Sequence, residues 1–145
     1  MFNVTLNIGK KRRIVVAIIV MLMIVILFEI GASLKKTNQQ QILGQTNEQR
    51  IEFIHLRGHN VIDNPINVKT ITIPQNFSDV YNNYNSLQIK AGFNLELYKG
   101  KEAVLYTYSA LGYDTQVNVN LLVCDGVIIG GDISSVELNG FMNPL

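Results

Sequence analysis

Hydrophobic and polar positions divide this chain of 145 residues into two unequal parts. The first part is dominated by fifteen consecutive apolar residues, 14–28, which directly follow four cations at 10–13. Extended to residue 34, this segment forms a helix of about 32 Å, enough for a hydrocarbon core of about 30 Å. Because cations hold the adjacent end of an apolar helix in the cytoplasm, the pattern predicts a cytoplasmic N-terminus over 1–13 and a transmembrane signal anchor over 14–34.

A cleaved secretory signal is the competing interpretation of this pattern. The apolar run is followed by three small residues, Gly31, Ala32 and Ser33, and cleavage after Ala32 or Ser33 is chemically plausible. The anchor is favoured because the run is at the upper length limit for such a signal and no strong helix breaker precedes the small residues. Both interpretations place the rest of the chain outside the cytoplasm, and no cysteine follows the run at a position for lipid attachment.

The second part contains a polar linker and one domain. Residues 35–45 are rich in amides and lack an apolar period, which indicates a linker and leaves an extracytoplasmic domain over 46–145. From Thr46 onward, ten acidic and six basic residues give a net charge of about −4, although the whole chain carries +1. This balance leaves no basic stripe for nucleic acid and opposes electrostatic binding to anionic lipid.

Helical periodicity is clearest at two places in this domain. A capping box at Thr46 and Gln49 begins a helix expected over 47–57. A second helix over 77–91 is the best-defined element, because six apolar residues recur there at spacings of three and four. The members of this stripe are Phe77, Val80, Tyr81, Tyr84, Leu87 and Ala91.

Strand patterns fill most of the remaining positions. β-Branched residues predict a strand over 66–73, and alternation with a period of two predicts four more. These four are expected over 93–98, over 101–110, from 116 to an Asp125-Gly126 turn, and over 127–133. Helices grouped before a meander are typical of an α+β domain. We therefore expect an α+β fold in which an N-terminal transmembrane helix is followed by two helices packed on one face of one antiparallel sheet.

A longer pattern extends from Ile73 to Phe141. It includes Tyr84-Asn85-x-Leu87-Gln88, Gly92-Phe93-x-Leu95-x-x-Tyr98-x-Gly100-Lys101, Asp125-Gly126-x-Ile128 and Gly130-Gly131-Asp132. This pattern resembles a domain-of-unknown-function family found in small membrane-anchored proteins of Gram-positive bacteria, and it covers nearly all of the expected domain. The resemblance implies a membrane anchor and this domain boundary. The family has no assigned activity, ligand or catalytic residue, so the resemblance supplies no function.

The histidines and the cysteine give only weak evidence for a metal site or a reactive thiol. His55 and His59 are four residues apart and, with Asp63, form a candidate metal site. Gly58 is expected to end the helix before His59 and no fourth ligand is visible, so two surface histidines are favoured, and no metal or other cofactor is expected. For Cys124, the single cysteine, burial in a strand is favoured over a reactive thiol or an intermolecular disulfide.

Four residues are weak candidates for ligand binding: Tyr84, Asn85, Gln88 and Asp132. Most tyrosines are expected in or beside the core, with an exposed aromatic binding patch as the alternative. For Asn85 and Gln88, hydrogen bonding to the neighbouring loop is favoured over ligand contact. Asp132 follows two glycines that mark a bulge or a close approach of the backbone to the helices. A solvated or turn-capping carboxylate is favoured there, because a single carboxylate has no partner for acid–base catalysis.

No catalytic triad spacing, nucleophile elbow or phosphate loop is present in the sequence. We therefore expect a single-pass cell-membrane protein whose exported domain binds an envelope protein or a cell-wall component without catalysis. A cell-envelope hydrolase or hydrolase inhibitor is the alternative, and a sensory module is disfavoured because only residues 1–13 are expected in the cytoplasm. A deep cleft joining Asp132 to His55 or His59 would favour an enzyme, whereas an exposed apolar patch or an open edge strand would favour a binding module.

Overall fold

The structure is a computed structural model, and it describes residues 15, 20–24 and 41–145. The chain divides into two compact units, Met1–Gln40 and Gln41–Leu145. The described residues of the first unit are helical. The second unit contains the predicted domain.

Among the residues described, no helix combines the length and the apolar character that crossing a membrane requires. The expected fold is therefore wrong in one respect, because the described structure contains no transmembrane helix. Most of the predicted span 14–34, and all of 1–13, lie outside the described residues.

The second unit is an α+β domain built on one antiparallel sheet. Its elements in chain order are α2 (Asn47–Leu56), β1 (Asn67–Thr72), α3 (Asp79–Lys90), a 3-10 helix η1 (Leu95–Tyr98), β2 (Glu102–Ser109), β3 (Val117–Cys124), β4 (Val127–Ser135) and β5 (Met142–Pro144). The strands follow one another in the sheet in chain order, from β1 at one edge to β5 at the other. The α+β class and the antiparallel meander agree with the sequence analysis.

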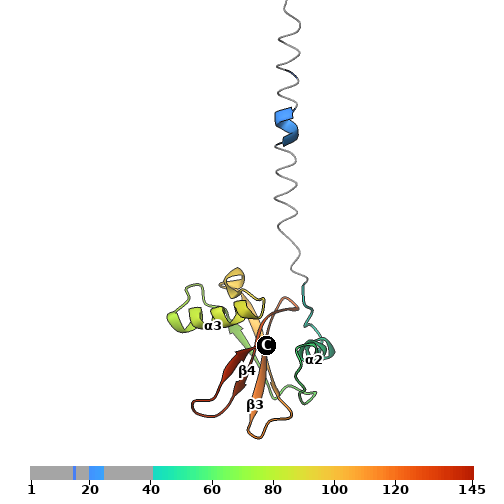
Figure 1. Cartoon of the computed structure of the whole chain (residues 1–145), viewed down its shortest axis with the longest axis vertical. Coiled ribbons are helices and arrows are strands. Elements are labelled where there is room, and N and C mark those ends of the chain that lie inside the picture. Colours follow the sequence, from blue (N-terminus) through green and yellow to red (C-terminus); the bar gives the residue numbers. More distant parts are fainter. Residues whose placement is uncertain (1–14, 16–19, 25–40) are drawn as a thin grey trace, which may run out of the picture. The chain divides into compact units, whose positions relative to one another are not determined.

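The helices α2 and α3 lie on opposite faces of the sheet (Figure 1). Phe53 of α2 packs in one core cluster with Leu121 of β3, whereas Tyr84 of α3 packs against a second cluster that contains Leu122. The expectation that both helices cover one face is therefore wrong. Successive side chains of a strand point to opposite faces, so the unbroken buried run 121–124 in β3 needs cover from both sides.

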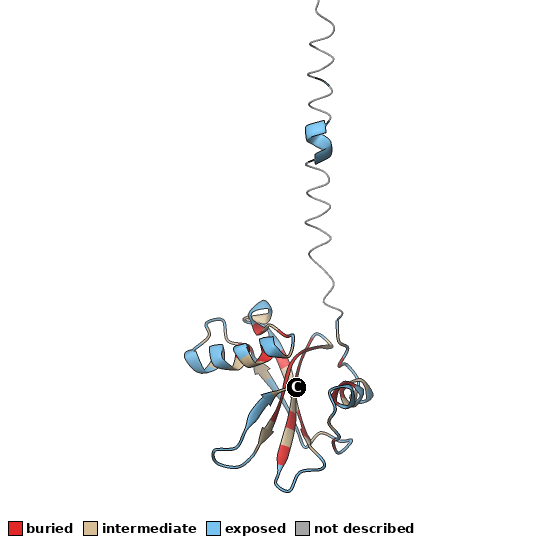
Figure 2. Ribbon diagram, viewed as in Figure 1, coloured by how far each residue is buried: buried red, intermediate tan, exposed pale blue. Residues whose placement is uncertain are grey.

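The core follows the central strands of the sheet. In Figure 2 the buried residues are concentrated in the strands between the two helices. Cys124, near the end of β3, is 3 % exposed, which confirms its predicted burial in a strand.

The inward face of α3 is more polar than the predicted stripe. Ser78 caps the N-terminus of the helix, where its side chain accepts a hydrogen bond from the Tyr81 amide. Val80, a member of the stripe, is 78 % exposed, whereas Asn85 and Gln88 are buried. The face of α3 that packs on the sheet therefore includes tyrosine and amide side chains.

Residues 93–98, predicted as a strand, form an irregular segment at 93–94 followed by η1. The side chain of Asn85 accepts a hydrogen bond from the Leu95 amide at 2.8 Å, and that of Asn94 accepts one from the Glu96 amide at 3.0 Å. The amides of Leu95 and Glu96 therefore donate to asparagine side chains and not to the carbonyls of a neighbouring strand. Leu97, one of the alternating apolar residues, is 63 % exposed, so the alternation here does not mark a buried face.

The domain begins earlier than predicted. The Ile128 amide donates to the Ile42 carbonyl at 2.8 Å, and the Gly44 amide donates to the Gly126 carbonyl at 2.9 Å. These bonds add a short antiparallel segment beside the start of β4. Residues 41–45, predicted as the end of a linker, therefore belong to the folded unit.

The buried side chain of Arg50 holds this segment in place. Its Nη1 donates to the carbonyls of Gly44 and Gln45 at 2.8 and 3.1 Å, and its Nε donates to the Tyr108 hydroxyl at 2.8 Å. The guanidinium lies 3.7 Å from the centroid of the Tyr106 ring. Because guanidinium can bond several acceptors and stack on a ring at once, Arg50 joins the start of the domain to α2 and β2.

Candidate functional site

A row of polar side chains lies between α3 and the sheet. The Tyr84 hydroxyl donates to Asp132 Oδ2 at 2.8 Å, and Asn120 Nδ2 donates to Asp132 Oδ1 at 2.9 Å. Thr107 Oγ1 in turn donates to Asn120 Oδ1 at 2.9 Å. Thr107, Asn120 and Asp132 are direct neighbours on β2, β3 and β4 and so share one face of the sheet.

Asp132 is 2 % exposed, and no cation pairs with it among residues 41–145. Burial raises the pKa of this carboxyl, although hydrogen bonds from Asn120, Tyr84 and Ser134 act in the opposite direction. Burial, assisted by the adjacent carboxylate, also raises the pKa of the Tyr84 hydroxyl. Tyr84 therefore keeps its proton and remains the donor in this pair.

Gln88 connects α3 to β4 within the same cluster. Its Oε1 accepts a hydrogen bond from the Gly131 amide at 2.7 Å. A Cβ at Gly130 would lie 2.9 Å from this oxygen, so the absence of a side chain there allows the close approach. The pairing of β3 with β4 also shifts between Leu122 and Val123, as in a β-bulge. The close approach of the glycine pair to a helix is confirmed, and the predicted bulge lies one residue before the pair, at Ile129.

The contacts define the roles of the four sequence candidates. The structure brings together three of them, Tyr84, Gln88 and Asp132. Asn85 instead hydrogen-bonds the neighbouring loop at the start of η1, which is the role that the sequence analysis favoured. The expectation of a solvated or turn-capping Asp132 is wrong, because its register places it opposite Asn120 and beneath α3. This cluster is internal, so its hydrogen bonds position α3 on the sheet.

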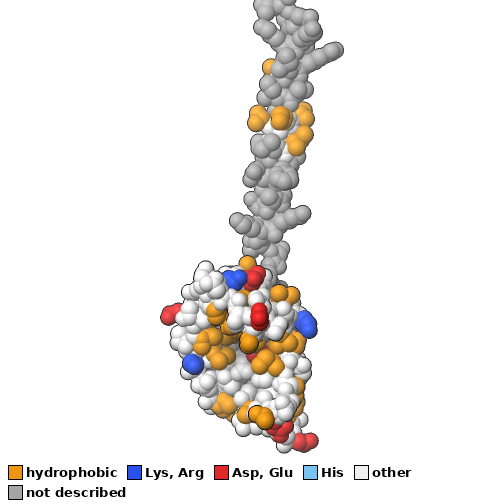
Figure 3. Space-filling view, turned by 90° about the vertical axis from the view of Figure 1, so that its left-hand side faces the viewer, with side chains coloured by type: hydrophobic (Ala, Val, Ile, Leu, Met, Phe, Trp, Pro, Cys, Tyr) orange, Lys and Arg blue, Asp and Glu red, His pale blue; other side chains and the backbone are white. Residues whose placement is uncertain are grey.

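Figure 3 looks onto the side of the domain that carries α3. Apolar patches are visible there, with acidic and basic side chains scattered around them. The hollows described by the structure lie beside α2, on the other side of the sheet.

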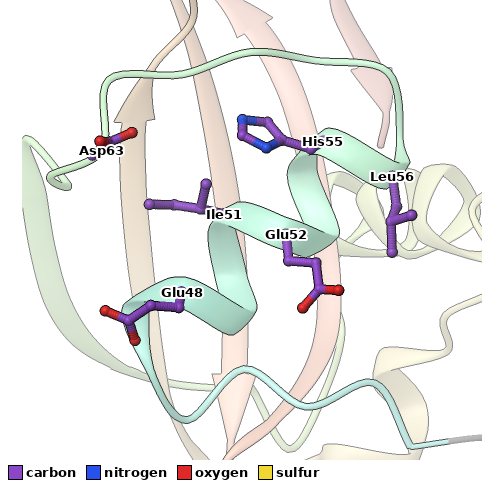
Figure 4. A pocket seen from close by; sticks show the side chains of 6 residues that line it. All are labelled: Glu48, Ile51, Glu52, His55, Leu56 and Asp63. Carbon is purple, nitrogen blue, oxygen red and sulfur yellow. The ribbon is translucent and has the colours of Figure 1, made fainter.

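An open hollow of about 460 Å³ lies on the outer side of α2 (Figure 4). Its lining consists of Glu48, Ile51, Glu52, His55 and Leu56 from α2 and of Asp63 from the loop that follows. In Figure 4 Ile51 points toward Asp63, with Glu48 and His55 to either side of it. The hollow therefore combines apolar side chains with carboxylates.

A second hollow of about 310 Å³ adjoins the first along the same helix. It shares Glu52 and Leu56 with the first hollow, and its other lining residues are Ile42, Leu43, Gln49 and Phe53. Leu56, common to both hollows, is 79 % exposed. We call the lining residues of the two hollows together the α2 groove.

The α2 groove is negatively charged. Glu48, Glu52 and Asp63 line it together with no lysine or arginine, and none of these carboxylates forms an ion pair within the described part of the domain. A hydrogen bond from its own backbone amide, a second from the Thr46 side chain and the charge of Arg50 hold the pKa of Glu48 below its ordinary value. Glu48 is therefore ionised at neutral pH.

The predicted metal candidates do not converge. His55 lines the groove, whereas the Nδ1 atom of His59 lies 3.5 Å from the Tyr113 hydroxyl. Gly58 has a φ of +84°, which ends the helix before His59 as expected. No three histidine, cysteine or acidic side chains are grouped for a metal ion in the described ranges.

The groove residues other than His55 and Asp63 were not among the sequence candidates, although a signal was present. Positions 48, 51, 52, 55 and 56 are separated by three and four and so share a face of the predicted helix. That face carries two glutamates together with exposed Leu56 and partly buried Ile51, whose side chain also packs against the core cluster of Phe53 and Ile54. An exposed leucine beside two glutamates, on a helix that also packs on the core, indicates a second contact surface.

These features define an α+β domain whose five-stranded antiparallel sheet lies between two helices, one of which presents an acidic apolar groove. Comparison with models of protein families, with curated proteins and with solved structures finds no match for the chain. The resemblance to a domain-of-unknown-function family stays a prediction, so the function is argued from the site itself.

Proposed function

We propose that the domain is a non-catalytic binding module that docks a protein partner on the α2 groove. The proposal is carried by exposed Leu56 and its apolar neighbours, which lie among carboxylates on the outer face of a helix whose inner face is already packed. Burial of such apolar surface against a partner is favourable. The hollows are open, which suits a protein segment better than a small molecule, since pockets for small molecules enclose most of the ligand.

The alternative, a cell-envelope hydrolase or hydrolase inhibitor, has less support. Asp132 is buried on the side of α3, whereas His55 belongs to the side of α2. The deep cleft that would favour catalysis is therefore not formed by these residues. The location outside the cytoplasm, and an envelope protein or cell-wall component as partner, stay predictions from the sequence.

Selection of displayed peptides on the full chain tests the proposal. Selected peptides should bind the wild type and bind Leu56→Ser at least about tenfold more weakly, as expected for an apolar anchor at an interface. Val80→Ser is the matched control, because Val80 is equally exposed but lies on α3. Failure to select any peptide, or equal binding to both variants, would contradict the proposal.

A further inference from the structure

We infer that the partner segment is cationic: a stretch of protein that presents one or two apolar side chains flanked by lysine or arginine. This inference rests on the proposed binding function of the α2 groove and specifies the chemistry of its partner. It follows from the charges, the apolar residues and the geometry of the groove.

The sign of the partner's charge follows from three groove carboxylates that form no ion pair with any residue of 41–145. Glu48, Glu52 and Asp63 lie along the groove. Arg50 of α2 is buried and occupied by carbonyls and tyrosines. Arg57, which follows Leu56, lies over the Phe53 ring at 5.0 Å and donates to the Ala91 carbonyl at 3.3 Å. Opposite charges across an interface raise the association rate and suppress wrong partners, whereas like charges placed together are costly. A segment with lysines or arginines complements this groove, and an acidic segment is repelled.

The apolar component comes from the position of Leu56. Leu56 and Glu52 line both hollows, so they form the boundary between them. Ile51 supplies apolar surface on one side of this boundary, and Leu43 supplies it on the other. An apolar partner side chain in one or both hollows would bury Leu56 while the flanking cations meet the carboxylates.

Three short synthetic peptides test the inference on the full chain. The first is amphipathic and contains leucine and lysine, the second replaces every lysine by glutamate, and the third replaces every leucine by serine. The first peptide should bind, and the other two should bind at least about tenfold more weakly. Its affinity should also fall as salt concentration rises, because the carboxylates are exposed to solvent.

Two triple variants localise the binding. Glu48→Gln/Glu52→Gln/Asp63→Asn should weaken binding of the leucine–lysine peptide about tenfold and reduce its salt dependence. The matched control Glu102→Gln/Asp114→Asn/Glu137→Gln removes the same charge from exposed positions outside the groove and should change the affinity less than about twofold. All six positions are exposed, so both variants should keep the wild-type circular dichroism spectrum.

The outcomes separate the inference from the proposed function. Equal weakening by both triple variants would show general attraction to an acidic protein and would overturn the inference. Equal binding of the lysine and glutamate peptides would overturn it as well, but would leave the proposed function intact if Leu56→Ser still weakened both. Equal binding of the leucine and serine peptides, with no effect of Leu56→Ser on any peptide, would overturn both.

Discussion

Gly130 leaves room for the side chain of Gln88, which reaches from α3 to β4. In a Gly130→Ala variant the new Cβ would lie 2.9 Å from Gln88 Oε1 and 3.4 Å from Leu95 Cδ2. Gln88 would have to move, and the Gly131 amide would lose its acceptor. We expect the free energy of unfolding in urea to fall by about 1–3 kcal/mol, the usual cost of an unsatisfied buried donor.

Asn83→Ala provides the control for this measurement. Asn83 lies on the exposed face of α3, so its replacement should change the free energy of unfolding by less than about 0.5 kcal/mol. If Gly130→Ala were as stable as this control, the Gln88 contact would contribute nothing to the fold.

Asp132 should make stability depend on pH in an unusual direction for a carboxyl group. Its pKa is raised above the ordinary value of 3.8 because the group is buried. The folded chain thus binds this proton more tightly than the unfolded chain does. The resulting stabilisation is complete below the ordinary pKa and is lost as the pH rises through the raised pKa.

Asp132→Asn tests this dependence, because an amide does not titrate and can still form hydrogen bonds with Asn120 and Tyr84. The free energy of unfolding should be measured for both proteins between about pH 3 and pH 8. The stability of the variant relative to the wild type should increase with pH. A difference that stays constant across this range would mean that the pKa of Asp132 is the same in the folded and unfolded chains.

The segment before α2 behaves as a structural element although it is too short to be named as one. Deleting residues 1–40 removes none of the described contacts of the domain, so a fragment 41–145 should unfold cooperatively. A fragment 46–145 would lose the bonds of Ile42 and Gly44 and the carbonyls that bind Arg50. Because a buried guanidinium without acceptors is costly, we expect 46–145 to be less stable by at least about 2 kcal/mol in urea. Equal stability would show that the domain begins at Thr46, as predicted from the sequence.

Element prediction succeeded where signals within the element, such as periodicity, β-branched residues and capping residues, decide the structure. Local sequence pattern directly predicts the capping box at Thr46, the two long helices and the strands β1 to β4. Prediction failed at 93–98, where the deciding contacts come from the side chains of Asn85 and Asn94, which local periodicity does not show. The short strand β5 also escaped detection, because three residues are too few to show alternation.

Burial on both sides of the sheet should be visible in hydrogen exchange. β3 pairs with β2 and β4 and carries buried residues on both faces, so its amides should exchange most slowly among the strands. β1 lies at the edge of the sheet and its residues are mainly exposed, so its amides should exchange much faster. Mass spectrometry of peptic fragments measures this directly. Equal protection of β1 and β3 would indicate that the β1 edge is covered by another chain.

The arrangement of the two helices was partly encoded in the sequence. The run Leu121, Leu122, Val123 and Cys124 is apolar at every position, which is typical of a strand covered on both faces. The Asp132 cluster could not be predicted in the same way, because it depends on the register that brings Thr107, Asn120 and Asp132 into one row. Register is a property of the assembled sheet and not of any single strand.

The pairing of Ile42 and Gly44 beside β4 has a mechanical consequence. Hydrogen bonds between antiparallel strands run across the strand direction, so a pull along this segment loads its bonds together in shear. Arg50 shares the load, since it binds the carbonyls of Gly44 and Gln45 and is itself anchored on Tyr108. Tension applied through the chain at Gln41 is therefore transmitted to the sheet and to α2 at once, and the helix that carries the groove is held at the point where force enters the domain.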